Sequence, residues 1–288
     1  MEKSSSLNVF VVKDIPKLNI FKTFDCGQCF RFNPVNYFGH KYEFEGVAFS
    51  KYVVFAQDND NEIYIYNSTE EDYHNIWKKF LSLDVDYESI NEKIKDATNS
   101  EHMKEAVDYG DGIRILRQND WECICSFIIS QNNNIPRIKK IIESLCSKYG
   151  DEHNYNEAKY YSFPSYQVLS NLTEKDIFDL KTGFRAKYIL DAAKKISSGE
   201  IDLEKIHSSD DFDYCLKELS KIKGIGPKVA SCALLFGFEK TEAFPIDVWM
   251  KRALLKYFPN GIDLNKLGKT AGIAQQYLFY YEKYNQKP

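Results

Sequence analysis

A short glycine-rich segment, KGIGPK at residues 223–228, separates two helix-like stretches of this 288-residue chain. Glycine tolerates the positive φ that a tight turn between helices requires, and it lets the backbone approach another molecule closely. Proline, here Pro227, is well suited to the first turn of a helix. The segment therefore predicts a hairpin of two helices at about residues 212–237, with unpaired amides at the start of the second helix.

The rest of the chain divides into a strand-like part and a helical part. Residues 41–49, 51–56 and 62–66 have the alternation and composition of strands, with QDNDN as a turn between the last two. From about Thr69, apolar residues recur at helical spacing to the end of the chain. We expect helices at 85–108, 119–131, 134–149, 166–171, 174–179, 185–198, 210–221, 227–237, 248–258 and 264–284.

This order predicts an α+β fold. An N-terminal antiparallel β-sheet domain with flanking helices would occupy residues 1–110. A mostly helical domain containing the hairpin would occupy residues 111–288.

The composition limits the cellular compartment and the cofactors that we expect for this protein. The first residues, MEKSSSLNVFVVKD, lack a signal-peptide apolar segment, and the longest apolar run, 229–238, is too short to span a bilayer. Seven irregularly spaced cysteines favour a reduced intracellular protein, in the cytoplasm or nucleoid, or in the nucleus of a eukaryote. Cys26 and Cys29 form a CxxC without a second pair at zinc spacing, so we expect no metal.

Charge is distributed unevenly along the chain. The formal net charge is −4, but residues 41–110 carry 7 basic and 16 acidic residues, a net of −9, and the remainder carries +5. A basic patch on a mildly acidic protein is compatible with DNA binding, and so is an ordinary solvated surface.

The hairpin itself is typical of proteins that hold the DNA backbone. Amides at a helix start, together with the helix dipole, favour a phosphate. Lys223, Gly224 and Gly226 are the candidate backbone contacts. The alternative is an ordinary tight turn with no ligand.

Lys228 and Asp247 form the candidate catalytic pair. Asp247 stands just before the helical stretch VWMKRALLKYF, so it is a good N-cap, and Lys228 could simply contact a phosphate. If the carboxylate faces Lys228, however, it can deprotonate the ammonium and stabilise positive charge developing on a sugar. The neutral lysine could then attack the sugar carbon and form a Schiff base.

Two further pairs at i, i+4 spacing accompany these residues. Cys232 shares a helix face with Lys228, and Gln275 shares one with Phe279. An amide can read the edge of a base and a ring can stack on it. Core packing is the alternative for Cys232, Gln275 and Phe279.

Taken together, these motifs resemble the helix-hairpin-helix DNA glycosylases with a Gly/Pro-rich loop and a catalytic aspartate, and most specifically the 8-oxoguanine DNA glycosylase/lyases. The resemblance rests first on GIGPKVASC followed by FPIDV. Further matches extend it over nearly the whole chain: CGQCFRF at 26–32, GIRILRQNDWECICSFIISQNNNIPRI at 112–138, FPSYQVL at 163–169, GFRAKYI at 183–189 and AQQYLFYYE at 274–282.

The resemblance implies a monomer-like enzyme, without a membrane association, that flips 8-oxoguanine out of double-stranded DNA, excises it opposite cytosine and nicks the strand by β-elimination. Lys228 would be the nucleophile and Asp247 the catalytic carboxylate. The carbonyl of Gly27 would accept the N7 hydrogen of the lesion, Cys232 and Phe279 would sandwich the base, and Gln275 would read its pairing edge. Some relatives carry an iron–sulfur cluster on C-terminal cysteines, but no cysteine follows Cys232, so no cofactor is expected.

By the same resemblance, another set of residues handles the opposite strand and the vacated space. Its members are Asn132, Asn133, Arg137, Phe184 and Arg185. The chain departs from the family pattern at Phe184, where a tyrosine wedge is usual, and at Trp249, where a histidine often stands near a phosphate.

Two alternatives remain open. A glycosylase for alkylated bases would share the sheet-plus-helices plan, but such enzymes use water and need no lysine. A non-catalytic helix-hairpin-helix protein would bind DNA without the Lys228–Asp247 pair.

Overall fold

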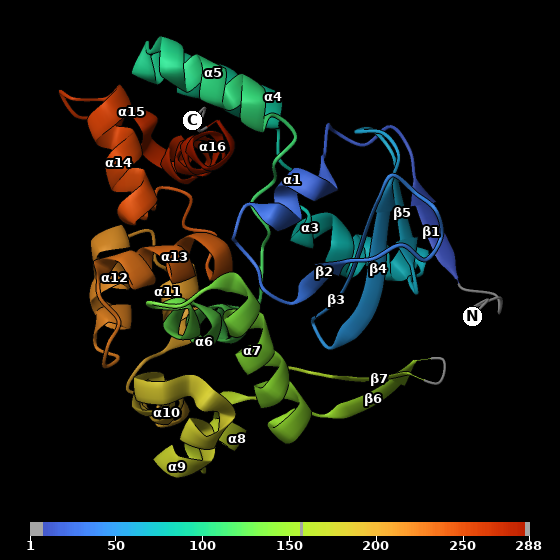
Figure 1. Cartoon of the computed structure of the whole chain (residues 1–288). Helices are drawn as coiled ribbons and strands as arrows, with labels where there is room; N and C mark the ends of the chain where they lie inside the picture. Colours follow the sequence, from blue (N-terminus) through green and yellow to red (C-terminus); the bar gives the residue numbers. More distant parts are fainter. Residues whose placement is uncertain (1–7, 156–157, 286–288) are drawn as a thin grey trace.

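The computed structural model describes residues 8–155 and 158–285, and Figure 1 shows a β-sheet beside a larger group of helices. The sheet is antiparallel, with its five strands in the order β1-β5-β4-β3-β2. The strands are β1 (Val9–Val12), β2 (Phe32–Pro34), β3 (Tyr42–Ala48), β4 (Lys51–Gln57) and β5 (Ile63–Tyr66). The predicted strands correspond to β3, β4 and β5, and the α+β fold class is confirmed. Residues 1–7, part of the N-terminal stretch in which no signal peptide is expected, lie outside the described ranges.

One face of the sheet is apolar and is covered by helices. Phe55 of β4 pairs with Phe44 of β3 and Ile65 of β5, so these side chains lie on the same face. Trp77 and Phe80 pack their rings against Phe55. The elements that cover this face are α1 (Ile20–Asp25), a π-helical turn (Tyr73–Trp77) and α3 (Lys78–Phe80). Helix α2 (Glu70–Asp72) precedes the π-helical turn and buries no residue. The sheet domain therefore has a core of its own.

The helical part has a second, larger core. Its helices are α4 (Tyr87–Thr98), α5 (Glu101–Gly110), α6 (Asp120–Ser130), α7 (Ile135–Tyr149), α8 (Tyr166–Ser170), α9 (Glu174–Ile177), α10 (Ala186–Ser197), α11 (Leu203–Ser208), α12 (Phe212–Ser220), α13 (Pro227–Gly237), α14 (Val248–Tyr257), α15 (Leu264–Leu267) and α16 (Ala271–Tyr284). Helices α4 and α5 pack with α15 and α16, and the hydroxyl of Tyr277 donates to Asn91 Oδ1 at 2.8 Å. Residues 87–110, assigned to the sheet domain from sequence, thus contribute to the helical core.

The structure corrects several helix predictions. The single helix expected at 85–108 is divided, because Asn99 takes a left-handed φ of 43° and Ser100 starts α5 as its N-cap. The helix expected at 264–284 is divided at Gly268, whose φ is 51°. Four elements, β1, β2, α1 and α11, were not predicted from the sequence. The helical part also contains an unpredicted two-stranded hairpin, β6 (Glu152–Tyr155) and β7 (Ala158–Tyr161).

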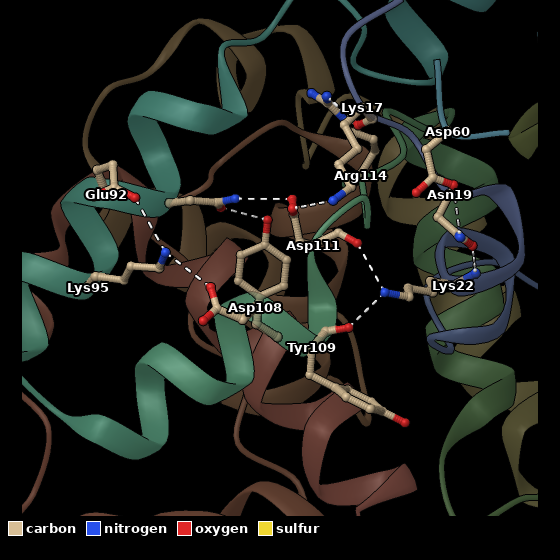
Figure 2. Close-up of polar contacts among 12 residues, drawn as sticks. Lys17, Asn19, Lys22, Asp60, Glu92, Lys95, Asp108, Tyr109, Asp111 and Arg114 are labelled. Atoms are coloured by element: carbon tan, nitrogen blue, oxygen red, sulfur yellow. Dashed lines mark hydrogen bonds and ion pairs between the residues drawn. The ribbon is translucent and has the colours of Figure 1, made fainter. Parts of the chain in front are cut away.

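A buried arginine joins the two parts of the molecule (Figure 2). Arg114 is 2% exposed and donates through Nε and Nη2 to the carbonyl of Lys17, at 2.9 and 2.6 Å, and through Nη1 to the carbonyl of Val85 at 3.1 Å. Its guanidinium also lies 4.2 Å from the centroid of the Tyr87 ring. Burial removes hydration from this cation and lowers the pKa of Arg114. The neighbouring Lys17–Asp111 ion pair, at 2.7 Å, reinforces the same junction.

The glycine hairpin joins α12 to α13, and only one of its two glycines has a positive φ. Gly224 has a φ of 79°, and a Cβ at this position would collide with the ring of Tyr188. Gly226 has a φ of −96° and is the N-cap of α13, without a side-chain cap hydrogen bond. The amide of Lys223 donates to Asp191 Oδ2 at 2.8 Å, so α10 supports the turn.

We predict that Gly224→Ala lowers the free energy of unfolding by more than Gly199→Ala. Gly199 is the matched control, because its φ of 77° is nearly the same but nothing lies within 4 Å of an added Cβ. The control should lose about 1–2 kcal/mol from the left-handed backbone alone. Gly224→Ala should lose at least about 1 kcal/mol more from overpacking against Tyr188. Urea unfolding measures both, and equal losses would contradict the close approach.

Candidate active site

One small pocket brings together six of the predicted site residues. Its volume is about 60 Å³. The pocket lies between α13, α16, the loop at residues 26–27 and the segment before α14. Its lining residues are Cys26, Gly27, Phe127, Lys228, Cys232, Phe236, Pro245, Asp247, Gln275, Gln276 and Phe279.

Lys228 enters the pocket from the first turn of α13. Its Nζ lies 5.8 Å from the centroid of the Phe127 ring, and within the described ranges no carboxylate oxygen lies within 4.0 Å of it. Cys232, one turn later, is 4% exposed. Burial raises the pKa of the Cys232 thiol to about 11, although the nearby Lys228 ammonium opposes the rise. Cys232 is therefore a protonated, apolar surface at neutral pH.

Asp247 is fixed by the start of α14. It is the N-cap of this helix, and its Oδ1 accepts a hydrogen bond from the amide of Met250 at 2.8 Å. The N-cap interpretation is confirmed, and the same carboxylate lines the pocket together with Lys228. A rigid carboxylate and a lysine free of an ion pair therefore face one cavity.

The opposite wall presents the groups predicted to bind a base. Gly27 has a φ of 79°, and a Cβ at this position would lie 3.8 Å from the ring of Phe279. Gln275 is 4% exposed, and its Oε1 is buried without a hydrogen-bond partner in the described part of the chain. A buried acceptor without a partner costs roughly 1–3 kcal/mol, so this oxygen calls for a donor from a ligand or from water.

Five residues of the lining were not predicted from the sequence. Phe127 and Phe236 stack with ring centroids 5.5 Å apart, and the Nζ of Lys228 lies over the ring of Phe127. The other missed members are Cys26, Pro245 and Gln276. Cys26 and Gln276 are adjacent to predicted residues, and Pro245 lies in the FPIDV motif. Whether their side chains point into the pocket depends on the tertiary structure.

The residues predicted to face the opposite strand form a second group, outside the pocket. Asn132, with a left-handed φ of 47°, follows α6, and Arg137 lies in the first turn of α7, exposed, with Nη2 donating to the carbonyl of Lys181 at 3.2 Å. Asn133 Nδ2 donates to the carbonyl of Ile129 at 3.0 Å. Arg137 thus presents its guanidinium at the surface.

Arg185 differs from Arg137 because it is 2% exposed. Its guanidinium donates to the carbonyls of Gln131, Asn132 and Thr182, the last two at 2.9 and 3.1 Å. Burial, and to a smaller extent the charge of Arg137, lower the pKa of Arg185. In this structure Arg185 holds the loop after α6, and it could read a base edge only by exchanging some of these bonds.

Both departures from the family pattern are exposed aromatic residues. Phe184 is 48% exposed and follows Gly183, whose φ is 62°, with the Arg185 guanidinium 4.4 Å from its ring centroid. Trp249 is 39% exposed, and the guanidinium of Arg252 lies 5.5 Å from its ring centroid. A wedge at Phe184 is therefore sterically available.

The predicted backbone contacts Lys223, Gly224 and Gly226 are exposed, but the amide of Lys223 already has a partner. The Lys223 amide is bound to Asp191, and its Nζ lies 3.7 Å from the same carboxylate. Of the groups of Lys223, only the side chain, 71% exposed, is available to a phosphate. The uncapped N-terminus of α13, at Gly226, is the more open amide site.

Over residues 8–155 and 158–285, no three His, Cys, Asp or Glu side chains gather closely enough to hold a metal ion. No helix within those ranges is long and apolar enough to cross a membrane.

Two protein-family models match consecutive parts of the chain. The model described as "8-oxoguanine DNA glycosylase, N-terminal domain" matches residues 10–124. The model described as "HhH-GPD superfamily base excision DNA repair protein" matches residues 125–266.

Individual relatives agree with these matches. The "Probable N-glycosylase/DNA lyase" of Methanothermobacter thermautotrophicus is 31% identical over 212 residues, 63% of this chain and 67% of the relative. The "N-glycosylase/DNA lyase" of Saccharomyces cerevisiae is 31% identical over 231 residues, 75% of this chain but only 61% of the relative. The solved 8-oxoguanine glycosylase/lyase of Clostridium acetobutylicum, in complex with double-stranded DNA containing cytosine opposite 8-oxoguanine, has a TM-score of 0.87 and 38% identity, covering 98% of this chain and 99% of that one. The chain therefore belongs to the 8-oxoguanine DNA glycosylase/lyase family, within the helix-hairpin-helix superfamily of base excision DNA repair proteins.

Proposed function

We propose that this protein excises 8-oxoguanine, and related oxidised purines, from double-stranded DNA opposite cytosine, and then cleaves the strand as a lyase. Family membership supports the reaction class, and the complex of the Clostridium relative supports the substrate. The observation that carries the proposal is the pocket itself. It combines in one cavity Lys228, Asp247 and the buried Oε1 of Gln275, which has no hydrogen-bond partner among the described residues.

In the proposed complex the flipped base enters between Cys232 and Phe279. Phe279 lines this pocket and is a partly buried ring. Gln275 Oε1 accepts a hydrogen bond from the pairing edge of the base. The carbonyl of Gly27 accepts the N7 hydrogen, which 8-oxoguanine has and guanine lacks.

The chemistry begins with the neutral amine of Lys228. Its Nζ attacks C1′ of the sugar, and the bond from C1′ to N9 of the base breaks, so the base leaves with the bonding electrons. Asp247 stabilises positive charge that develops on the sugar and assists proton removal from the lysine. Opening of the sugar ring gives a Schiff base between Nζ and C1′. Loss of a proton from C2′ then expels the 3′ phosphate by β-elimination.

The opposite strand is held by the second group of residues. Arg137 donates to the acceptor edge of cytosine, and Phe184 fills the space left by the flipped nucleotide. Arg185 supports both by fixing the loop that carries Asn132 and Asn133, and it joins the base contact if its main-chain bonds rearrange. Lys223, Gly224, Gly226 and Trp249 complete the contacts to the DNA backbone.

The same observations disfavour the two alternatives. A non-catalytic DNA clamp gives no reason for a lysine and a carboxylate in one pocket with an unpartnered amide oxygen. A water-using glycosylase for alkylated bases gives no role to Lys228. We further propose that the protein acts as a monomer inside the cell, where its DNA substrate lies.

We predict that Lys228→Gln abolishes base release and the covalent complex formed with borohydride, because no amine remains to form the Schiff base. DNA binding should persist, since the hairpin is unchanged. The matched control is Lys217→Gln on α12, which removes the same charge from an exposed position of the hairpin helices. Trapping on DNA with 8-oxoguanine opposite cytosine measures both variants. A trapped complex with Lys228→Gln would assign the chemistry to another amine.

We also predict that Arg137→Met reduces the preference for cytosine opposite the lesion. A bidentate contact to a base edge is worth about 1–3 kcal/mol of discrimination, so the rate ratio for cytosine against adenine should fall by roughly tenfold. Lys140→Met, an exposed position one turn along α7, controls for the lost charge. Single-turnover rates opposite all four bases measure the effect. A uniform loss opposite every base would instead assign Arg137 to a phosphate.

A further inference from the structure

Gln276 lies beside Gln275 but directs its amide to the protein instead of to the centre of the pocket. Its side chain is 3% exposed, and its Nε2 donates to the carbonyl of Cys26 at 2.7 Å. This carbonyl belongs to the peptide that joins Cys26 to Gly27. Helix α16 therefore holds, through one buried hydrogen bond, the peptide immediately before Gly27.

The peptide after Gln28 is held as well, from the other side. Gln118 Nε2 donates to the carbonyl of Gln28 at 2.7 Å. The Gln28 side chain is fully buried, donates to the carbonyls of Thr23 and Arg114 at 2.9 and 2.8 Å, and accepts from the amide of Leu116 at 2.8 Å. The two ends of the Gly27 segment are thus fixed by separate parts of the fold.

Between these fixed points, Gly27 itself is the permissive position. Its φ of 79° is accessible to glycine at little cost, and without a Cβ the residue can adopt many other φ and ψ values. The Gly27–Gln28 peptide, which carries the Gly27 carbonyl, could therefore rotate if either neighbouring peptide were released. Gly27 alone does not fix the direction of its carbonyl.

We propose that Gln276 is a positioning residue for lesion recognition, which fixes the Cys26–Gly27 peptide and thereby the direction of the Gly27 carbonyl. The inference rests on the proposed function, in which that carbonyl accepts the N7 hydrogen of 8-oxoguanine. Gln276 does not touch the base in this role. Its effect is on selectivity, because a misdirected carbonyl neither accepts the N7 hydrogen of the lesion nor opposes the N7 lone pair of guanine.

The competing explanation is a purely structural role, in which Gln276 only docks α16 onto this region. Helix α16 is, however, attached to the same region at a second place. Lys283 Nζ donates to the carbonyl of Asp25 at 2.9 Å, and the hydroxyl of Tyr284 contacts the Asp25 carboxylate. These contacts hold the end of α1 without Gln276. Loss of Gln276 should therefore leave α16 docked while freeing the peptide next to Gly27.

The test compares DNA affinity in a Lys228→Gln background, in which no base is released. Dissociation constants are measured by fluorescence anisotropy for duplexes with 8-oxoguanine, guanine, or an 8-oxoguanine analogue that carries C–H in place of N7–H, each opposite cytosine. The background protein should bind 8-oxoguanine more tightly than the other two. Adding Gln276→Met should reduce both preferences roughly three- to tenfold, the value of one hydrogen bond.

Gln57→Met is the matched control. Gln57 is 1% exposed, and its Nε2 donates to the carbonyl of Leu18 at 2.7 Å. The Gln57→Met substitution therefore removes a buried hydrogen bond equivalent to that of Gln276, but within the sheet domain. It should lower stability in urea without changing either preference. If Gln276→Met does not fold, Gln118→Met releases the segment from the other side and should reduce the same two preferences.

The outcomes separate the inference from the proposed function. No preference for 8-oxoguanine in the Lys228→Gln background would overturn the proposed function. A preference that Gln276→Met leaves unchanged would overturn the inference alone. Equal losses with Gln276→Met and Gln57→Met would assign Gln276 a structural role. A loss confined to Gln276→Met, or shared only with Gln118→Met, supports positioning.

Discussion

The buried guanidinium of Arg114 is the interaction on which the site geometry depends. By donating to the carbonyls of Lys17 and Val85, it fixes the segment that crosses between the sheet core and the helical core. That segment in turn supplies the carbonyl of Arg114 and the amide of Leu116 to Gln28. The position of the Gly27 loop at the pocket therefore follows from a junction between domains, in which the guanidinium of Arg114 and the side chain of Gln28 both donate to main-chain carbonyls.

The catalytic half of the pocket depends on a different constraint, the start of helix α14. The amide of Met250 holds Asp247 at the N-cap, so this carboxylate is committed to the helix and is not in ion-pair contact with Lys228. A direct ion pair would stabilise the ammonium, which cannot attack a sugar carbon. Separation of the two groups is thus compatible with Lys228 as a nucleophile and with Asp247 as a stabiliser of charge on the substrate.

The sequence predicted the elements that follow from the residues of a single segment. It did not predict the elements that depend on packing against other parts of the chain. Alternation identified β3 to β5, and the Gly-Pro pattern identified the hairpin, because both follow from the preferences of single segments. The break at Asn99 and the β6–β7 hairpin needed knowledge of tertiary packing. Within the site, motifs located Lys228, Asp247 and Gln275, whereas Gln276 has no signal of its own: its function depends on a carbonyl 250 positions away.

The pocket contains one acceptor that a bound base can use. Gln275 Oε1 is buried and has no hydrogen-bond partner among residues 8–155 and 158–285, so a ligand or a water has to supply its donor. In the proposed function 8-oxoguanine offers one donor to Gln275 and another, its N7 hydrogen, to the carbonyl of Gly27, whereas guanine lacks the second donor. Selectivity in that function rests on the direction of the Gly27 carbonyl, and the preceding peptide is held by the buried hydrogen bond from Gln276.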